Sequence, residues 1–113
     1  WDNSRLSGSL GPTRFLMNFI PKEKQPAEVI NYLQKRNDTA LTILESHLSG
    51  KNWVAANQLS AADFSCCSYL FYPEEFGFDR KCHPNIDRWL SNIEALENWK
   101  HPYDLLERAY PPK

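Results

Sequence analysis

The sequence lacks an excess of charge of either sign. Its 113 residues carry 13 basic and 14 acidic side chains, which gives a formal net charge of -1. These charges are spread along the chain, so they supply no basic face that could neutralise the phosphates of a nucleic acid. We therefore expect no nucleic-acid partner.

Long apolar runs are also missing. No stretch approaches the roughly 18 to 20 residues that a helix needs to cross a bilayer. The first residues, WDNSRLSGS, lack the basic and apolar regions of a secretory signal peptide. These absences predict a soluble, cytoplasmic protein that is not secreted and that has no membrane partner.

Cysteine is scarce, with only Cys66, Cys67 and Cys82 in the chain. The count is odd, and two adjacent cysteines on a helix point about 100° apart, so they cannot easily bridge. The pair Cys82-His83 has no second pair at ligand spacing, so we predict no metal site. Reduced thiols in a cytosolic protein fit this pattern best.

Helical periodicity is what the sequence does contain. Residues 27–48 and residues 84–96 each place apolar side chains three and four positions apart, which predicts two amphipathic helices. The first should end at Ser49-Gly50, because glycine readily adopts the left-handed conformation that terminates helices. The second should start at Pro84, where the missing N–H of proline costs nothing.

The rest of the chain adds shorter helices. Residues 1–20 predict a kinked helix, because glycine and proline at positions 8, 11 and 12 interrupt its apolar spacing. Pro102 starts a short final helix. With 42% apolar residues, residues 1–113 should form one domain, an all-α bundle of about five helices.

The stretch LSAADF, residues 59–64, places a hydroxyl and a carboxylate three residues apart in front of an apolar run. With Ser60 at the N-cap, Asp63 falls at the third helical position, and the two predict a reciprocal capping box. Leu59 and Phe64 then occupy the two positions of a hydrophobic staple. We interpret these four residues as structural, at the start of a helix buried on nearly every side.

A catalytic interpretation of the same stretch would make Ser60 a nucleophile and Asp63 its partner. The sequence offers neither a positioned histidine nor a G-x-S-x-G turn to support it. Cys66 and Cys67 fall in the predicted core, where burial raises the pKa of a thiol and lowers its reactivity. We therefore assign no catalytic residue to this chain.

The order and spacing of these signals resemble the C-terminal helical domain of the cytosolic glutathione S-transferases. The likeness rests on the S/T-x-x-D box at residues 60–63, the preceding loop KNWVAA, and the downstream segments HPNIDRWL and WKHPY. The segment GSLGP at residues 8–12 also looks like the first helix of this domain in bacterial members. One departure is Ala56, where many members carry glycine.

This resemblance implies a function as well as a fold. Family members carry an N-terminal thioredoxin-like domain that activates the glutathione thiol, and nothing in residues 1–113 resembles it. The full-length protein would transfer glutathione, its co-substrate, to electrophiles, or use it to reduce disulfides or peroxides. Residues 1–113 would supply a wall of the pocket for a small hydrophobic or electrophilic substrate, and much of a homodimer interface through the first two helices. Alone, they would bind no cofactor and show no activity.

Candidate pocket residues follow from the same resemblance. Arg5, Ser9 and Thr13 fall four residues apart and predict a polar stripe opposite the apolar residues of the first helix. In the family this helix borders the cleft between the domains, so the stripe would touch the co-substrate or glutathione, and the alternative is a solvated face. Tyr110 is a candidate because the family's tail often closes over the pocket. Arg14 is either a contact for an anionic ligand or a member of an ion pair.

A second functional hypothesis belongs to another class. The same helical fold serves as a non-catalytic protein-interaction module in subunits of translation elongation factors and in some aminoacyl-tRNA synthetase complexes. A helical segment without the thioredoxin-like half fits this role too. Binding of the complete protein to immobilised glutathione, with turnover of a generic electrophile, would count against it.

Overall fold

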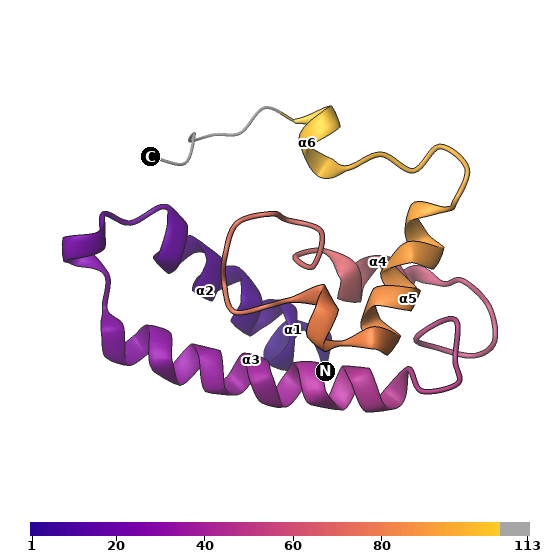
Figure 1. Ribbon diagram of the computed structural model, residues 1–113, viewed down its shortest axis with the longest axis horizontal. Coiled ribbons are helices and arrows are strands. Elements are labelled where there is room, and N and C mark those ends of the chain that lie inside the picture. The colour runs from indigo at the N-terminus through magenta and orange to yellow at the C-terminus, as the bar shows by residue number, and fades with distance from the viewer. Residues whose placement is uncertain (107–113) are drawn as a thin grey trace.

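The computed structural model describes residues 1–106, and these residues form helices and turns without a β-strand (Figure 1). The α-helices are α1 (Asp2–Arg5), α2 (Ser7–Asn18), α3 (Ala27–His47), α4 (Ala61–Cys67), α5 (Pro84–Glu94) and α6 (Pro102–Leu105). Two 3-10 turns, η1 (Lys22–Lys24) and η2 (Arg80–Cys82), lie between them. The predicted all-α fold is confirmed.

The kink of the N-terminal helix lies at Leu6, where φ is -95° and ψ is -82°, and it separates α1 from α2. The prediction placed the interruption at residues 8–12, but those residues lie inside α2. Gly8 still explains the sharpness of the kink. A Cβ atom on Gly8 would lie 1.9 Å from the carbonyl oxygen of Asn3, so only glycine lets α2 pass this close to α1.

Helix α3 runs along one whole side of the molecule (Figure 1). Helix α2 packs directly against α3, and the connection between the two helices contains η1. Its bounds agree with the predicted helix over residues 27–48, because Leu48 is its C-cap. Gly50 follows with a φ of +67°, the left-handed conformation that the sequence predicts for it. The helix therefore begins and ends where the sequence indicates.

The hydrophobic core lies between α2, α3, α4 and α5. Its centre is Trp89, the largest fully buried side chain. The buried cluster consists of Leu6, Leu10, Ala40, Leu41, Leu44, Leu48, Cys66, Cys67, Leu70, Phe76, Ile86, Trp89, Leu90 and Ile93. The four members from α5 recur at helical spacing, so the predicted amphipathic helix at residues 84–96 packs as expected.

Helices α3 and α5 also satisfy each other's ends. The Glu45 carboxylate on α3 accepts the backbone N–H groups of Asn85, at 2.8 Å, and Ile86, at 2.9 Å. Both groups belong to the first turn of α5, which cannot pair them internally. In the other direction, the Arg88 guanidinium donates to the carbonyl oxygen of Leu48 at the end of α3, at 2.7 Å. The two helices are thereby fixed in register.

Helix α4 is shorter and more exposed than the sequence predicts. It ends at Cys67 and continues as a turn, and it buries only Asp63, Cys66 and Cys67. The expectation of a helix buried on nearly every side is wrong, because Phe64, Ser65 and Ser68 are exposed. One flank of α4 packs into the core, and within residues 1–106 the other flank faces solvent.

Candidate functional site

The structure separates the predicted polar stripe of the first helix into one exposed and two buried side chains. Arg5 is exposed, whereas Ser9 and Thr13 are 1% and 0% exposed. The two buried residues share a helix face with Leu6 and Leu10, because positions separated by three, four and seven residues lie on one side of a helix. The prediction that the stripe lies opposite the apolar residues is therefore wrong for Ser9 and Thr13.

Ser9 and Thr13 instead take part in a buried polar contact between α2 and α3. The Thr13 hydroxyl donates to the carbonyl oxygen of Ser9, at 2.8 Å, and accepts from Nδ2 of Asn37, also at 2.8 Å. The Ser9 hydroxyl lies 3.4 Å from the carbonyl oxygen of Leu33. The Asn37–Thr13 and Ser9–Leu33 contacts join the two helices. A direct role for Ser9 and Thr13 in a pocket stays a prediction.

Arg5 lines a surface groove between α1 and α3 with a volume of about 200 Å³. The lining residues are Trp1, Arg5, Arg36, Thr39, Ala40 and Ile43. Trp1 and Ile43 are about half exposed, and Arg36 donates to the carbonyl oxygen of Ser4 at 3.0 Å. The groove thus combines apolar walls with two guanidinium groups, a surface that suits a flat apolar group or an anion. The other pocket candidate, Tyr110, lies outside the described residues.

Arg14 forms a compact cluster with Glu74 and Tyr103, residues that come from three separate parts of the chain. Its Nη2 atom donates to Oε1 of Glu74, at 3.2 Å, and to the Tyr103 hydroxyl, at 2.6 Å. The Tyr103 hydroxyl in turn donates to the same Glu74 oxygen. The Arg14 and Glu74 side chains are 15% and 7% exposed. Of the two alternatives for Arg14, the structure shows an ion pair.

The cluster fixes the protonation of its two acids. Burial alone raises the pKa of Glu74, but hydrogen bonds from Tyr103, from the backbone and from Arg14 outweigh it and hold the pKa below its ordinary value. Burial and then the hydrogen bond to Glu74 raise the pKa of Tyr103. At neutral pH, Glu74 is therefore an anion and Tyr103 a neutral hydrogen-bond donor.

Asp63 is the second buried carboxylate, and it is 0% exposed. Its Oδ1 atom accepts the backbone N–H of Val54, at 2.8 Å, and the indole N–H of Trp89, at 2.9 Å. Its Oδ2 atom accepts the backbone N–H of Ser60, at 2.9 Å, and the reciprocal capping box is present. The motif thus starts α4 and also ties it to the preceding loop and to α5.

These bonds leave no catalytic role for the Ser60 and Asp63 pair. The Ser60 hydroxyl accepts the N–H of Ala62, at 3.3 Å, and both oxygens of Asp63 already accept hydrogen bonds. The capping partner could be read from the sequence, whereas the bond to Trp89 crosses 26 positions and has no local signal. Phe64 is 51% exposed, and its staple with Leu59 stays a prediction.

The two adjacent cysteines are buried and held in the thiol form. Burial, with added repulsion from Asp2 and Asp63, raises the pKa of Cys66 to about 11. Burial likewise raises the pKa of Cys67 to about 12. The prediction that both cysteines lie in the core is confirmed, their low reactivity stays a prediction, and Cys82 is the exposed cysteine.

Within residues 1–106, no three side chains of His, Cys, Asp or Glu gather where they could hold a metal ion. Over the same residues, every helix is too short or too polar to span a bilayer.

Comparison with known proteins gives a consistent family. The model of the glutathione S-transferase C-terminal domain matches residues 13–97. Glutathione S-transferase D6 of Drosophila melanogaster is 40% identical over 64 residues, which cover 57% of this chain and 29% of that protein. Glutathione S-transferase D7 of the same organism is 31% identical over 73 residues, which cover 64% of this chain and 33% of that protein.

Solved structures agree with this fold. A glutathione S-transferase from Pseudomonas fluorescens superposes with a TM-score of 0.73 at 26% identity, over 85% of this chain and 48% of that one. A protein from Rhodopseudomonas palustris, described as a possible glutathione S-transferase, gives 0.74 at 23% identity, over 88% and 47%, and shows the fold alone. The chain spans about a third of the curated relatives and about half of the solved chains. Because the domain model covers most of its residues, this chain belongs to the glutathione S-transferase family, as its C-terminal helical domain.

Proposed function

We propose that this chain is the helical half of a glutathione S-transferase that transfers glutathione to electrophiles or uses it to reduce disulfides or peroxides. The observation that carries the proposal is the match of residues 13–97 to the C-terminal domain of that family. The groove beside Arg5 supports a binding role, because its walls combine apolar side chains with two cations. The group that activates the glutathione thiol belongs to the rest of the complete protein.

The experiment uses the complete protein that contains this chain. It should bind immobilised glutathione and conjugate 1-chloro-2,4-dinitrobenzene, a generic electrophile, whereas residues 1–113 alone should give no turnover. A complete protein that neither binds glutathione nor turns over an electrophile or a peroxide would contradict the proposal. That result would favour the non-catalytic protein-interaction module instead.

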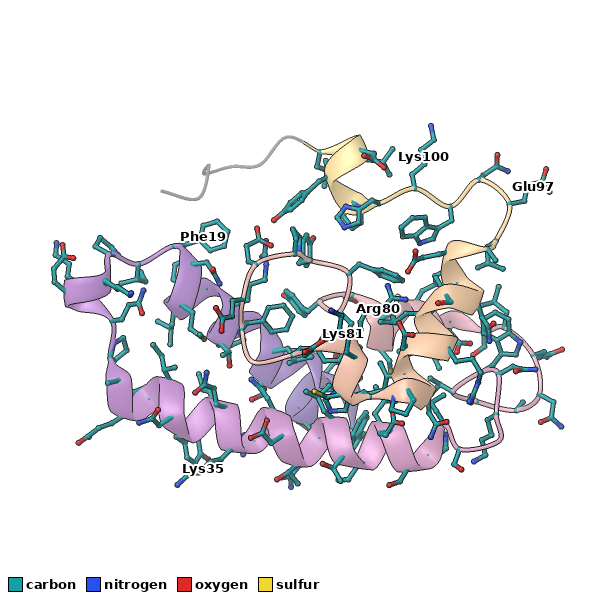
Figure 2. All side chains as sticks on the ribbon, in the orientation of Figure 1. Phe19, Lys35, Arg80, Lys81, Glu97 and Lys100 are labelled. Carbon is teal, nitrogen blue, oxygen red and sulfur yellow. The ribbon has the colours of Figure 1, made fainter. Side chains whose placement is uncertain are left out.

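Arg5 is the pocket contact that we propose from the described residues. Its side chain is exposed and lines the groove, whereas Ser9 and Thr13 would act from behind it by holding α2 against α3. Arg5→Ala should raise the KM of the complete enzyme for glutathione or for the electrophile about tenfold, the effect of losing one charge-assisted hydrogen bond. Lys35→Ala is the matched control, because Lys35 points away from the outer side of α3 (Figure 2). Equal changes in KM for the two substitutions would show that Arg5 does not contact the substrate.

The exposed side of α3 is our proposed homodimer face. Val29 and Tyr32 are 47% and 60% exposed, and their spacing of three positions places them on one side of the helix. Exposed apolar side chains that gather on one face favour a protein interface. Tyr32→Glu should convert a dimer of the complete protein to monomer in sedimentation velocity, while Lys100→Glu, an exposed position far from α3, should not (Figure 2). A wild-type protein that sediments as a monomer would refute this face.

A further inference from the structure

The last described part of the chain lies apart from the helical bundle. Figure 1 shows α6 separated from α2 to α5 by a long connection. Helix α6 contributes no buried residue, and Leu105 and Leu106 are 64% and 68% exposed. We refer to residues 100–106 as the C-terminal strap. Its attachment to the bundle therefore does not depend on burying aliphatic side chains.

The strap begins at an anchored aromatic residue. Trp99 packs against the core, and its ring lies 5.2 Å from the ring of Phe71. The preceding residue, Asn98, has a φ of +64°, a left-handed conformation that turns the chain. The imidazole of His101 then bonds through Nε2 to the carbonyl oxygen of Phe71, at 2.7 Å. Trp99, the residue before the strap, is thereby anchored to the core, and the first residues of the strap lie against Phe71.

Beyond His101, the strap is held at Tyr103, whose hydroxyl bonds to Arg14 and Glu74 of the bundle. We call these three residues the clasp. The Tyr103 ring also lies 5.2 Å from the ring of Tyr72, over which the Arg14 guanidinium is centred at 3.9 Å. The contacts that join the strap to the bundle come from two of its side chains, Tyr103 and His101, and they are polar and aromatic. Opening the strap would break them without removing a residue from the core.

The clasp is also incompletely paired. Nε of Arg14 and Oε2 of Glu74 are buried without a hydrogen-bond partner among the described residues. These two atoms are the donor and acceptor that a side-on arginine–carboxylate pair would join, so the ion pair uses one of its two bonds. Buried polar atoms without partners carry a desolvation cost, which offsets part of what the clasp contributes. The clasp is therefore weaker than its burial suggests.

We propose that the strap opens as a unit about Trp99 when the clasp breaks, while helices α2 to α5 stay folded. Opening uncovers the Tyr72 ring and the Arg14 guanidinium on the side of α2 where Phe19 lies (Figure 2). The strap thus controls access to a cation between aromatic rings. The proposal concerns this chain's own motion and holds whichever activity the complete protein has.

The test compares hydrogen exchange in the complete protein with two clasp variants, Glu74→Gln and Tyr103→Phe. The reporters in the strap are the amides of Asp104 and Leu106, which bond to His101 and Pro102 carbonyls at 2.9 and 3.0 Å. These bonds lie within the four-residue helix α6, which has too few residues to stay helical once it leaves the bundle, so opening exposes both amides to exchange. Loss of a charge-assisted hydrogen bond should speed their exchange about tenfold. The amides of α5, in the core, should not change, and neither should any amide in the control variant Glu75→Gln, whose residue is exposed.

Trypsin cleavage after Lys100 gives a second measurement, because Lys100 extends into solvent at the start of the strap (Figure 2). Both clasp variants should be cut there faster than wild type, with unchanged cleavage after Lys51 in the loop before α4. Unchanged strap amides in both variants would overturn the proposal. Equal acceleration of strap and α5 amides would overturn it as well, because the strap would then open only with the whole domain.

Discussion

Asp63 and Glu74 are two buried carboxylates that differ in their surroundings and in how completely their oxygens are hydrogen-bonded. Asp63 lies in the apolar core, and both of its oxygens accept N–H groups that belong to the loop, the helix start and α5. Glu74 lies at the edge of the bundle, and one of its oxygens has no partner among the described residues. A buried carboxylate thus stabilises a fold most when both of its oxygens accept hydrogen bonds and apolar side chains surround it.

Asp63→Ala removes the carboxylate of the core and should give the largest change in the free energy of unfolding. It would leave the N–H groups of Val54, Ser60 and Trp89 without their acceptor in the core. We expect the free energy of unfolding to fall by about 2 to 5 kcal/mol, since the buried indole N–H of Trp89 loses its acceptor at a cost of about 1 to 3 and the lost cap costs about 0.5 to 2. Urea denaturation followed by tryptophan fluorescence measures it.

The control for that measurement is Asp38→Ala, which removes an exposed carboxylate from the surface of α3. It should change the free energy of unfolding by no more than about 0.5 kcal/mol. Similar losses for Asp38→Ala and Asp63→Ala would show that the hydrogen bonds of Asp63 carry no special weight.

The thiols of Cys66 and Cys67 lie in the same core region as Asp63, so their reactivity also tests how well this region is protected from solvent. With their pKa raised by burial to about 11 and about 12, the thiolate fraction at pH 8 should be at least about a hundredfold below that of an ordinary cysteine. Iodoacetamide should therefore label Cys82 first, as followed by peptide mass spectrometry. In urea all three should react alike, and rapid labelling of Cys67 in the folded protein would be inconsistent with this core.

Glu74→Gln should break the weaker side, with a loss of at most about 1 kcal/mol in the free energy of unfolding, because only a local contact is removed. The pH dependence has a definite sign. The pKa of Glu74 is lowered in the folded state, so its contribution is present at neutral pH and is lost as pH falls through that lowered pKa. Strap exchange in wild type should speed up on acidification, after correction for intrinsic rates. The Gln variant should lack this response, and a loss that appears on raising the pH instead would reverse the sign.

Ala56→Gly should give the smallest change and should stabilise the protein. Ala56 has a φ of +54°, a left-handed conformation that strains a residue with a Cβ atom. Removing this strain outweighs the larger unfolded-state entropy of glycine, so we expect a gain of about 0.5 kcal/mol in urea denaturation. Ala55→Gly, the neighbouring control, should give no gain. A loss at position 56 would show that the turn is not strained.

Local signals explain why most of the fold could be predicted from the sequence. Helix α3 and helix α5 have unbroken apolar periodicity and clear end signals at Gly50 and Pro84, so their bounds agree with the prediction. Ala56 stands where many family members carry glycine, and it adopts the left-handed conformation that glycine favours. Where neighbouring residues decide the structure, the sequence is enough to predict it.

The candidate site depends on contacts between distant residues, and there the sequence was a poorer guide. Ser9 and Thr13 look polar along the helix but are buried, because α3 meets them with the Leu33 carbonyl oxygen and the Asn37 side chain, respectively. The clasp joins Arg14 to Tyr103 across 89 positions, a pairing that no local pattern contains. The kink lies at Leu6, before the glycines and proline, and Gly8 permits it through the close approach of α2 to α1, a contact between helices that the apolar spacing does not reveal.

Hydrogen exchange of the wild-type protein at neutral pH tests the contrast between the two regions most directly. The amides of Leu90 and Ile93, in α5 beside Trp89, should exchange only with global unfolding, so their opening free energy should equal that from urea denaturation. The amides of Asp104 and Leu106 should exchange through a separate opening of much lower free energy. Equal opening free energies for the two regions would contradict the account, because the strap would then be as firmly fixed as the core.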